Sequence, residues 1–582
     1  MTTKAVAQTR KMRARDFSRV SGHSSIPAKP AFRWFQWYWL LAGAFGIALI
    51  VFSPALTGSF VFDDYHLPFY AGAGNETNVR FWIGGVRPVL MLTYWANYLI
   101  SGLHPLSYHL FNIGIHAANA LFVFWILERV LGLAAYSGDR RRAALFGALC
   151  FLVHPLQTES VDYVAGRSEL VAAFFFAACW FTFLNGFEKK TSLLAALGIS
   201  FLGGLAVLGK ESAMTFPAVL LATDLYWGKE STTASVRRHI WLYAVFACGA
   251  LFAAPYAIRL VASPDILGGN ANPLLYALSE CRAIVYYVRL FVLPIGQNGD
   301  WQMLLYRSLT DGAALAYLVA VLGLLVAIVF TFRRNKLISF GLLLFLVMLS
   351  PTSSFMPIKD VLAERRMYLP SVGLIIALIG VASRVRIKVG HLRWAGAAAL
   401  VCLAVVSWNR SQVWVSDYQF WRDSAEKNYS NTRAHYGLGT AMLKARDCAG
   451  AVRELKVAFS QEPPTEHMRW DLGEAYICAK QPEEALRVFR SIAEKSPTAA
   501  VFVRVGYLEA SSGDVTSALD AFDHAIALDA GNADAWAYRG LAKVAIQDSN
   551  GASADLRHAL TIDSSNEIAL KGMGLLGKTS QQ

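Results

Sequence analysis

Long apolar runs recur through the first 411 residues of this chain and constrain its fold more than any other feature. Hydrophobic residues make up 55% of the sequence and charged residues 16%, against roughly 45–50% and about 25% in average soluble proteins. About eleven runs are long enough for membrane-spanning helices. They lie near residues 34–53, 106–132, 142–155, 168–186, 191–208, 213–228, 240–261, 312–332, 337–350, 367–384 and 393–408. The chain is therefore predicted to be all-α, with a polytopic membrane domain over 34–411.

Basic residues between these runs predict the orientation of the membrane domain. Residues 1–33 carry eight Lys and Arg and one acid, and are expected to be a cytoplasmic segment. In total, 23 of the 36 basic residues before residue 412 fall in segments on that same side. This count requires 88–101 and 279–295 to lie at or dip into the outer face. An outer loop at 54–105 follows, and the chain after residue 408 is expected outside, in the bacterial periplasm or a lumen.

The net charge of +13 first suggests a nucleic-acid partner, but its distribution argues against one. Residues 1–411 hold 36 basic and 19 acidic residues, whereas 412–582 hold 18 and 22. The excess belongs to the apolar part, where it is explained by membrane topology. We therefore expect membrane lipid, and no nucleic acid, as a partner.

A repeat with a period of 33–34 residues occupies the C-terminal part of the chain. Glycines recur at this spacing, and an alanine follows each of the first four glycines by twelve residues. The residues are Gly439, Gly473, Gly506, Gly540, Gly574, Ala451, Ala485, Ala518 and Ala552. This is the period of tetratricopeptide repeats, in which helix pairs stack into a solenoid. The sequence predicts such a domain over 433–582, after a linker at 412–432.

Two adjacent carboxylates, Asp63 and Asp64, lie in the first outer loop just beyond the first apolar run. Like charges so close together repel, and one of the pair tends to have a raised pKa, which suits a general base. A solvated loop start, or a turn that caps the next short helix, explains the same residues without chemistry. The sequence leaves both readings open.

Other ionisable and polar residues are expected at the same outer face. Such groups are costly at membrane depth, so they mark a polar site or pair with one another. Cations here could bind a lipid-linked phosphate, while ion pairing within the chain or snorkelling to the interface is the alternative. The candidates are Arg87, His154, Glu159, Arg167, Glu169, Lys210, Glu211, Glu364, Arg365, Arg366 and Tyr368.

Several motifs of common enzyme classes are missing from the sequence. It has no GxGxxG, Walker loop, GxSxG or HExxH, so nucleotide-driven transport and serine or zinc hydrolysis lack their usual residues. No ligand set for a metal is apparent, and no cofactor or divalent metal is expected. Cys448 and Cys478 could pair across adjacent repeats, although two buried thiols are the favoured reading.

Six phrases of the sequence, followed by the repeats, resemble the transmembrane-and-TPR-containing protein O-mannosyltransferases and their bacterial relatives. The resemblance covers nearly the whole chain after residue 34, with a repeat array of the shorter, bacterial type. The phrases are FVFDDYHLP, GVRPVLMLTYWANYLISGLHPLSYHLFNIGIHAANAL, LVHPLQTESVDYVAGRSELVAA, GKESAMTFPAVLLATDLYW, YYVRLFVLPIG and AERRMYLPS.

This resemblance implies a GT-C type glycosyltransferase that uses a polyprenyl-phosphate sugar and inverts the anomeric centre. Asp63 or Asp64 would deprotonate the acceptor hydroxyl, while cations hold the departing phosphate. The implied phosphate-binding residues are Lys210, Arg365, Arg366 and Arg167, oriented by Glu159, Glu169, Glu211 and Glu364. The sugar would be mannose or another hexose, and the acceptor a protein Ser or Thr. The site would lie on the periplasmic side of the bacterial inner membrane.

Two other classes of protein compete with this reading. A membrane-anchored scaffold would use the repeats to recruit partners, without any catalytic activity. A flippase or transporter would place polar residues through the membrane midplane, whereas here they gather at one face. The repeat groove could present an acceptor polypeptide to the membrane or serve assembly with a partner protein.

Overall fold

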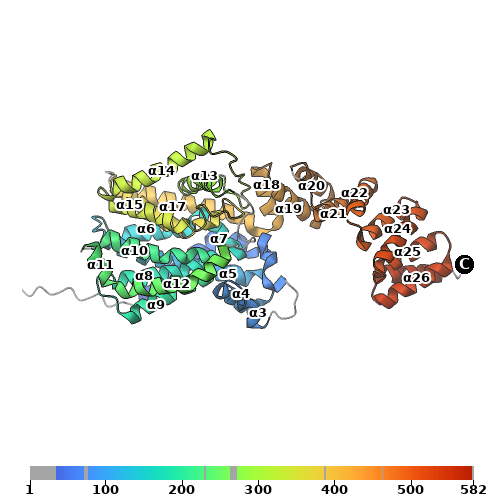
Figure 1. Cartoon of the computed structure of the whole chain (residues 1–582), viewed down its shortest axis with the longest axis horizontal. Coiled ribbons are helices and arrows are strands. Elements are labelled where there is room, and N and C mark those ends of the chain that lie inside the picture. Colours follow the sequence, from blue (N-terminus) through green and yellow to red (C-terminus); the bar gives the residue numbers. More distant parts are fainter. Residues whose placement is uncertain are drawn as a thin grey trace, which may run out of the picture.

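The computed structural model describes residues 34–70, 77–228, 231–261, 272–385, 389–461 and 463–579, and every regular element within them is helical. The segment 1–33, expected to be cytoplasmic, lies outside the described residues. A helical bundle forms one part of the molecule and a curved array of helix pairs the other (Figure 1). The all-α prediction is confirmed for the described part of the chain.

The bundle is built from helices that follow the predicted apolar runs closely. They are α2 (Trp34–Val51), α3 (Val79–Ile83), α4 (Pro88–Ser101), α5 (Pro105–Leu133), α6 (Arg140–Val153), α7 (Thr158–Asp162), α8 (Arg167–Gly186), α9 (Leu193–Gly209), α10 (Phe216–Trp227), α11 (Thr232–Arg238), α12 (Ile240–Val261), α13 (Pro273–Val292), α14 (Gly312–Phe332), α15 (Lys336–Leu349), α16 (Pro370–Ala382) and α17 (Val389–Ser411). Short 3-10 turns connect them, among them η2 (Phe62–His66), η5 (Val164–Gly166), η6 (Glu211–Thr215), η7 (Glu364–Met367) and η8 (Gln412–Val415).

Local sequence signals set where many of these helices begin. Proline occupies the first turn of α4, α5, α10, α13 and α16, where its missing N–H costs nothing. Other helices begin after a polar cap. The Asp311 carboxylate accepts from the backbone N–H groups of Ala313 and Ala314 at the start of α14. Such caps satisfy the N–H groups that a helix leaves unpaired at its first turn.

Only part of the predicted set of about eleven spans meets a strict length and hydropathy test. Among the described residues, four helical stretches do so, at 105–133, 164–186, 312–332 and 393–415. The bent pair α6 and Pro155–Asp162 gives a fifth, and five shorter apolar helices accompany them. The chain thus has the helices of a membrane protein, and the number that cross remains a prediction.

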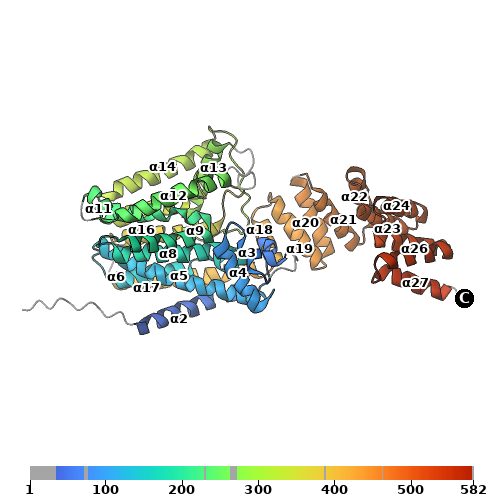
Figure 2. The same cartoon turned by 60° about the horizontal axis from the view of Figure 1, so that its bottom comes forward.

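The two ends of the bundle differ in the residues that they carry. The loops with clustered Arg and Lys, before α6, at α11 and between α14 and α15, lie at the end away from the repeats (Figure 1). The opposite end carries α4 and α13, next to the repeats (Figure 2), together with α7 (Figure 1). In Figure 1, α13 is seen close to end-on whereas α14 and α15 run across the picture. These basic loops are thus grouped at one end of the bundle, and the side of the membrane that this end faces remains a prediction.

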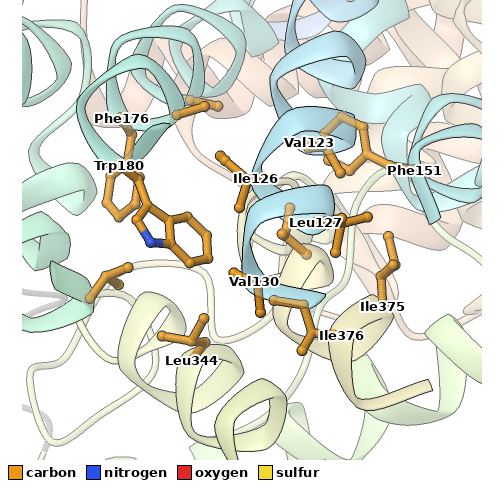
Figure 3. Packing of buried hydrophobic residues seen from close by; sticks show 14 of the residues in the cluster. Val123, Ile126, Leu127, Val130, Phe151, Phe176, Trp180, Leu344, Ile375 and Ile376 are labelled. Atoms are coloured by element: carbon orange, nitrogen blue, oxygen red, sulfur yellow. The ribbon is translucent and has the colours of Figure 1, made fainter. Parts of the chain in front are cut away.

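The core of the bundle is a continuous apolar cluster around α5. Val123, Ile126, Leu127 and Val130 of α5 meet side chains of α6, α8, α15 and α16, including Trp180 (Figure 3). The labelled side chains are all buried. This packing fixes the outer ends of these helices relative to one another, and the candidate site is built on those ends.

The repeat array consists of helix pairs, as the 33–34-residue period predicts. Its helices are α19 (Thr432–Lys444), α20 (Cys448–Gln461), α21 (Glu466–Cys478), α22 (Pro482–Lys495), α23 (Ala499–Ser511), α24 (Val515–Leu528), α25 (Ala533–Ala545), α26 (Ser549–Ile562) and α27 (Glu567–Thr579). A Cβ on Gly473 would lie 2.6 Å from the ring of Phe489, and one on Gly506 would lie 2.6 Å from the ring of Phe522. The periodic glycine therefore makes room for the large residue of the next helix.

The segment predicted as a linker, 412–432, is folded. It contains η8 and α18 (Asp417–Lys427). Trp414, Phe420 and Trp421 join Val61 and Tyr163 of the bundle and α19 of the repeats in one buried cluster. These aromatic side chains make the segment a packed junction, because burying their apolar surface is favourable.

Cys448 of α20 and Cys478 of α21 form a disulfide, with their Cα atoms 5.4 Å apart. The sequence-based preference for two buried thiols was therefore wrong. The bond joins two adjacent repeats and fits the predicted location of this domain outside the cytosol, since structural disulfides persist in oxidising compartments.

Candidate active site

Asp64 is the buried member of the acidic pair in η2. Its Oδ2 accepts from the backbone N–H of Val61 at 3.0 Å, and its Oδ1 accepts from that of Ala165 at 2.7 Å. Burial raises the pKa of Asp64 to about 8, although the two backbone donors oppose that shift. Asp64 thus joins the first outer loop to η5 and is shielded from any substrate.

Asp63 lies half-buried at the surface of the same turn. Its backbone N–H donates to the hydroxyl of Tyr163, 3.1 Å away. Burial raises the pKa of Tyr163; Asp64 and Asp63 raise it further, while the positive charge of Arg365 lowers it. Tyr163 therefore contacts the acidic turn, and it lies four residues after Glu159, the partner of Arg365.

Three cations near this turn are each paired with a glutamate. Arg87 Nη2 lies 2.7 Å from Oε2 of Glu211, and Lys210 Nζ lies 2.5 Å from Oε1 of Glu169. The pairing of Arg365 with Glu159 is double, because Nη1 and the backbone N–H both contact that carboxylate. The alternative of ion pairing within the chain thus holds for these three residues.

The three pairs form a single electrostatic cluster. Burial lowers the pKa of Lys210, Glu169 opposes this, and the charges of Arg87 and Arg365 lower it further. Cations gathered in this way attract an anion, and their glutamates hold them in place without blocking every donor. Arg365, for example, uses Nη1 and its backbone N–H for Glu159, and 22% of its side chain is exposed.

A small cavity adjoins this cluster between α8, η6, α15 and α16. Glu169 and Arg366 supply its charged groups, and Ser212 and Thr352 add hydroxyls. The remaining wall is formed by Ala172, Ala173, Ala213, Met348, Leu369 and Pro370. It thus combines a charged end with an apolar wall.

Arg167 differs from the other predicted phosphate ligands because it is completely buried. Its guanidinium donates to the side-chain oxygens of Asn112 at 2.7 Å and Asn97 at 2.6 Å, and to the backbone carbonyl of Tyr108 at 3.0 Å. Its Cζ also lies 4.5 Å from the ring centre of Tyr94. With its donors engaged inside the fold, Arg167 ties α4, α5 and α8 together, and we propose no phosphate contact for it.

Arg366 and Glu364 also have partners other than those expected. Arg366 donates to the backbone carbonyls of Thr352, Val361 and Asp360, so it organises the loop before η7. The Glu364 carboxylate accepts from Gln297 Nε2 at 2.6 Å, from the backbone N–H of Asn298 at 2.6 Å and from the Trp301 indole at 3.0 Å. Glu364 therefore shapes the 297–301 loop instead of orienting a cation.

His154 and Tyr368 are supporting residues inside the bundle. His154 Nε2 lies 3.0 Å from the carbonyl of Phe291, and its Nδ1 accepts from the backbone N–H of Leu156. The Tyr368 hydroxyl contacts His116 Nδ1 at 2.7 Å and Asn119 Nδ2 at 3.0 Å. Both residues fix the outer ends of helices and neither faces the cation cluster directly.

Sequence reasoning missed two residues that contact the acidic turn. Tyr163 lies in the quoted phrase LVHPLQTESVDYVAGRSELVAA, so its closeness to Glu159 in the sequence was a usable signal. Asp417 lies in the presumed linker, and no sequence signal pointed to it. Its carboxylate accepts from the Phe62 N–H at 3.2 Å and from the Tyr65 hydroxyl at 2.9 Å.

A second cavity lies in the repeats, between α22, α23 and α24. Arg490, Glu509, Phe502 and His524 are among the residues that line it. Within the described part of the chain, no group of three His, Cys, Asp or Glu side chains is arranged to hold a metal ion.

Comparison with known proteins identifies relatives of one kind. The chain is 26% identical over 486 residues to the protein O-mannosyl-transferase TMTC4 of Mus musculus, covering 70% of this chain and 64% of that protein. It is 24% identical over 447 residues to the human protein O-mannosyl-transferase TMTC3, covering 69% and 47%. The chain thus spans less than two thirds of these relatives. No family model matches it.

Among solved structures, the TPR protein YrrB, described as having an unusual peptide-binding site, is 21% identical and covers 31% of this chain and 89% of its own, with a TM-score of 0.26. The resemblance predicted from the sequence motifs is confirmed by the curated relatives, which are TMTC protein O-mannosyl-transferases.

Proposed function

We propose that this protein is a membrane glycosyltransferase that moves a mannosyl group from a polyprenyl-phosphate donor to a Ser or Thr hydroxyl of a protein. The observation that carries the proposal is the hydrogen bond from the Asp63 N–H to the hydroxyl of Tyr163, which lies in the segment between Glu159, the partner of Arg365, and Glu169, the partner of Lys210. In this proposal a base and a set of cations act together at one end of the bundle. The names of the curated relatives support the same class of reaction.

Asp63 is the general base in this proposal. Asp64 is fully buried and its raised pKa favours the protonated form at neutral pH, so it cannot readily take a proton from an acceptor. Asp63 is more accessible. Its carboxylate removes the proton of the acceptor hydroxyl while that oxygen bonds to the anomeric carbon. The bond from this carbon to the phosphate oxygen breaks, the phosphate keeps the electron pair, and the anomeric centre is inverted.

Lys210 and Arg365 stabilise the departing phosphate, and Arg87 adds to the positive potential. Glu169, Glu159 and Glu211 hold these cations in position, so little reorganisation is needed when charge develops on the phosphate. The leaving group is already an anion, and no step is assigned to a metal ion or another cofactor.

The cavity beside Glu169, about 20 Å³ in volume, has room for about one water molecule and not for the lipid chain of the donor. The polypeptide acceptor would approach from the side of the repeats, where the cavity between α22 and α24 offers charged and aromatic contacts. We place this face in the periplasm of a bacterial cell.

Transfer by the purified full-length chain tests the proposal. The protein in detergent is incubated with synthetic polyprenyl-phosphate sugars and Ser/Thr peptides, and the products are read by mass spectrometry and by NMR of the anomeric proton. We expect mannose on a hydroxyl with inverted configuration. Transfer of another hexose would revise the sugar alone. Absence of transfer from every donor, with the protein folded, would favour the scaffold alternative.

A further inference from the structure

The turn that carries Asp63 begins with a residue in an unusual backbone conformation. Phe62 has φ +53°, in the left-handed region that residues with a side chain rarely adopt. Such a conformation persists only where the surroundings impose it, and it is found preferentially at functional sites. Groups that contact both the ring and the backbone N–H of Phe62 hold this conformation in place.

Most of these groups come from a part of the chain about 350 residues away. The Phe62 ring stacks on Phe420, with ring centres 5.3 Å apart, and meets Trp421 edge to face at 5.3 Å. Both partners belong to α18. Arg433 of α19 adds a cation–π contact, with its Cζ 5.6 Å from the Phe62 ring centre. The side chain of Phe62 is thus bound by the helices that open the repeat domain.

Asp417 binds the same turn on both sides of Asp63, through the backbone of Phe62 and the side chain of Tyr65. Its Oδ1 accepts from the N–H of Phe62, and its Oδ2 accepts from the hydroxyl of Tyr65. From the bundle, the hydroxyl of Tyr163 accepts from the N–H of Asp63 itself. Asp63 is therefore fixed from two directions, by Tyr163 of the membrane domain and by Asp417 of α18.

The helices α18 and α19 are themselves anchored to the outer loops of the bundle. Arg410 Nη1 lies 2.5 Å from Oδ2 of Asp423, and Lys427 Nζ donates to the carbonyl of Gln297 at 2.6 Å. Arg433 pairs with Asp300 and, at 3.1 Å, with Asp360. Asp360 lies in the loop that leads to Arg365. The same two helices thus contact the turn of the base and the loop that precedes a phosphate-binding cation.

We infer that α18 and α19 complete the active site, with Asp417, Phe420, Trp421 and Arg433 acting as positioning residues for Asp63. The inference rests on the proposed function and deepens it. The start of the repeat domain has a role in the chemical step that is separate from any binding of acceptor by later repeats. None of the four residues need touch the substrate.

Kinetics of the full-length protein test this role. In Asp417→Ala both hydrogen bonds to the turn are lost, and we expect kcat to fall about 10- to 100-fold, since small misplacements of a reacting group have effects of this size. The KM for the acceptor peptide should stay unchanged. Asp417→Asn keeps one acceptor oxygen, and its kcat should lie between those of the wild type and Asp417→Ala. Asp471→Ala is the matched control, because Asp471 accepts from the Tyr436 hydroxyl within the repeats.

Amide hydrogen exchange provides a readout that does not depend on activity. Exchange over residues 60–66 should rise in Asp417→Ala and remain unchanged in Asp471→Ala. If the wild-type protein transfers no sugar, the proposed function fails. Amide hydrogen exchange over residues 60–66 still shows in that case whether α18 holds the turn. Should Asp417→Ala unfold, Phe62→Leu decides, because it removes the aromatic contacts and leaves Asp417 in place. Unchanged kcat and unchanged exchange at 60–66 would overturn the inference.

Discussion

One ion pair in the bundle and one in the repeat array differ widely in their exposure to solvent. The Lys210 and Glu169 side chains are 12% and 9% exposed, whereas Arg487 and Glu484 in α22 are 73% and 39% exposed. Charges removed from water interact strongly and are costly to leave unpaired, while exposed pairs are screened. The Lys210–Glu169 pair is therefore expected to interact more strongly than the Arg487–Glu484 pair.

Glycines show a second difference between the two regions. In the repeats, Gly473 faces a side chain, the ring of Phe489. In the bundle, a Cβ on Gly341 of α15 would lie 2.4 Å from the backbone oxygen of Gly373 and 2.5 Å from the backbone nitrogen of Ala377, both in α16. Small residues of this kind let membrane helices approach closely. The contact between α15 and α16 is thus made by backbone, whereas the contact between α21 and α22 is made by a side chain that fills a gap.

The largest difference between the regions should appear when a carboxylate is neutralised. Asp63→Asn is expected to reduce the rate of sugar transfer by roughly 10²–10⁴-fold, the contribution of a general base. Asp523→Asn, at an exposed partner of Arg539 in the repeats, should leave the rate unchanged. Initial rates with a saturating donor measure both. Equal rates for Asp63→Asn and the wild type would remove Asp63 from the proposed mechanism.

Breaking one ion pair in each region tests the contrast in burial. Glu169→Gln leaves Lys210 without its carboxylate and should lower the free energy of unfolding by about 3–5 kcal/mol. Glu484→Gln breaks the exposed pair with Arg487, for which about 0–1 kcal/mol is expected. Chemical denaturation in detergent gives both values. Equal losses in the free energy of unfolding for Glu169→Gln and Glu484→Gln would contradict the expected effect of burial.

Glycine substitutions test whether backbone contact restricts the bundle more than side-chain contact restricts the repeats. Gly341→Ala must separate α15 from α16, and we expect a loss near the upper end of the roughly 1–3 kcal/mol typical of overpacking. Gly473→Ala meets an aromatic ring that can adjust, so its loss should be smaller. Gly323→Ala in α14, with no atom within 4 Å of the added Cβ, is the control. Thermal unfolding midpoints rank the three variants.

The last prediction concerns the pH dependence of stability, which should have opposite signs in the two regions. Burial raises the native pKa of Asp64 to about 8, above its ordinary value of 3.8. Its contribution to stability is therefore present below about pH 4 and is lost as the pH rises through about 8. Burial acts to raise the pKa of Asp555 in α26, but hydrogen bonds from Arg539 and Lys543 outweigh it and lower the pKa. The contribution of Asp555 to stability is therefore present above its ordinary pKa of 3.8 and is lost as the pH falls through its lowered native pKa.

Unfolding midpoints between about pH 3 and 9 measure both contributions. Asp64→Asn should remove the decline toward alkaline pH and leave the acid side unchanged. Asp555→Asn should do the reverse. A variant of Asp64 that keeps the full alkaline decline would assign that decline to another group.

The outcome for individual residues shows how far sequence reasoning reached at the candidate site. Hydropathy and the basic loops predict an outer-face position for the acidic pair, and the structure connects Asp63 through Tyr163 to the segment that carries Glu159, the partner of Arg365. The partners were harder to predict. Glu211 pairs with Arg87 across 124 residues, Glu364 binds the 297–301 loop, and Arg167 is enclosed by asparagines and aromatic rings.

The sequence alone determined the helices, the repeat period, the sidedness of charge and the residue types available for chemistry. These properties depend on hydrophobicity and spacing along the chain, so they can be read without distances. Only the tertiary structure decided that Asp64 is buried while Asp63 is accessible. It also decided that α18 packs against Phe62, the first residue of the same turn. Those outcomes depend on which of many similar acids, arginines and aromatic rings meet in space, and packing between segments hundreds of residues apart sets that choice.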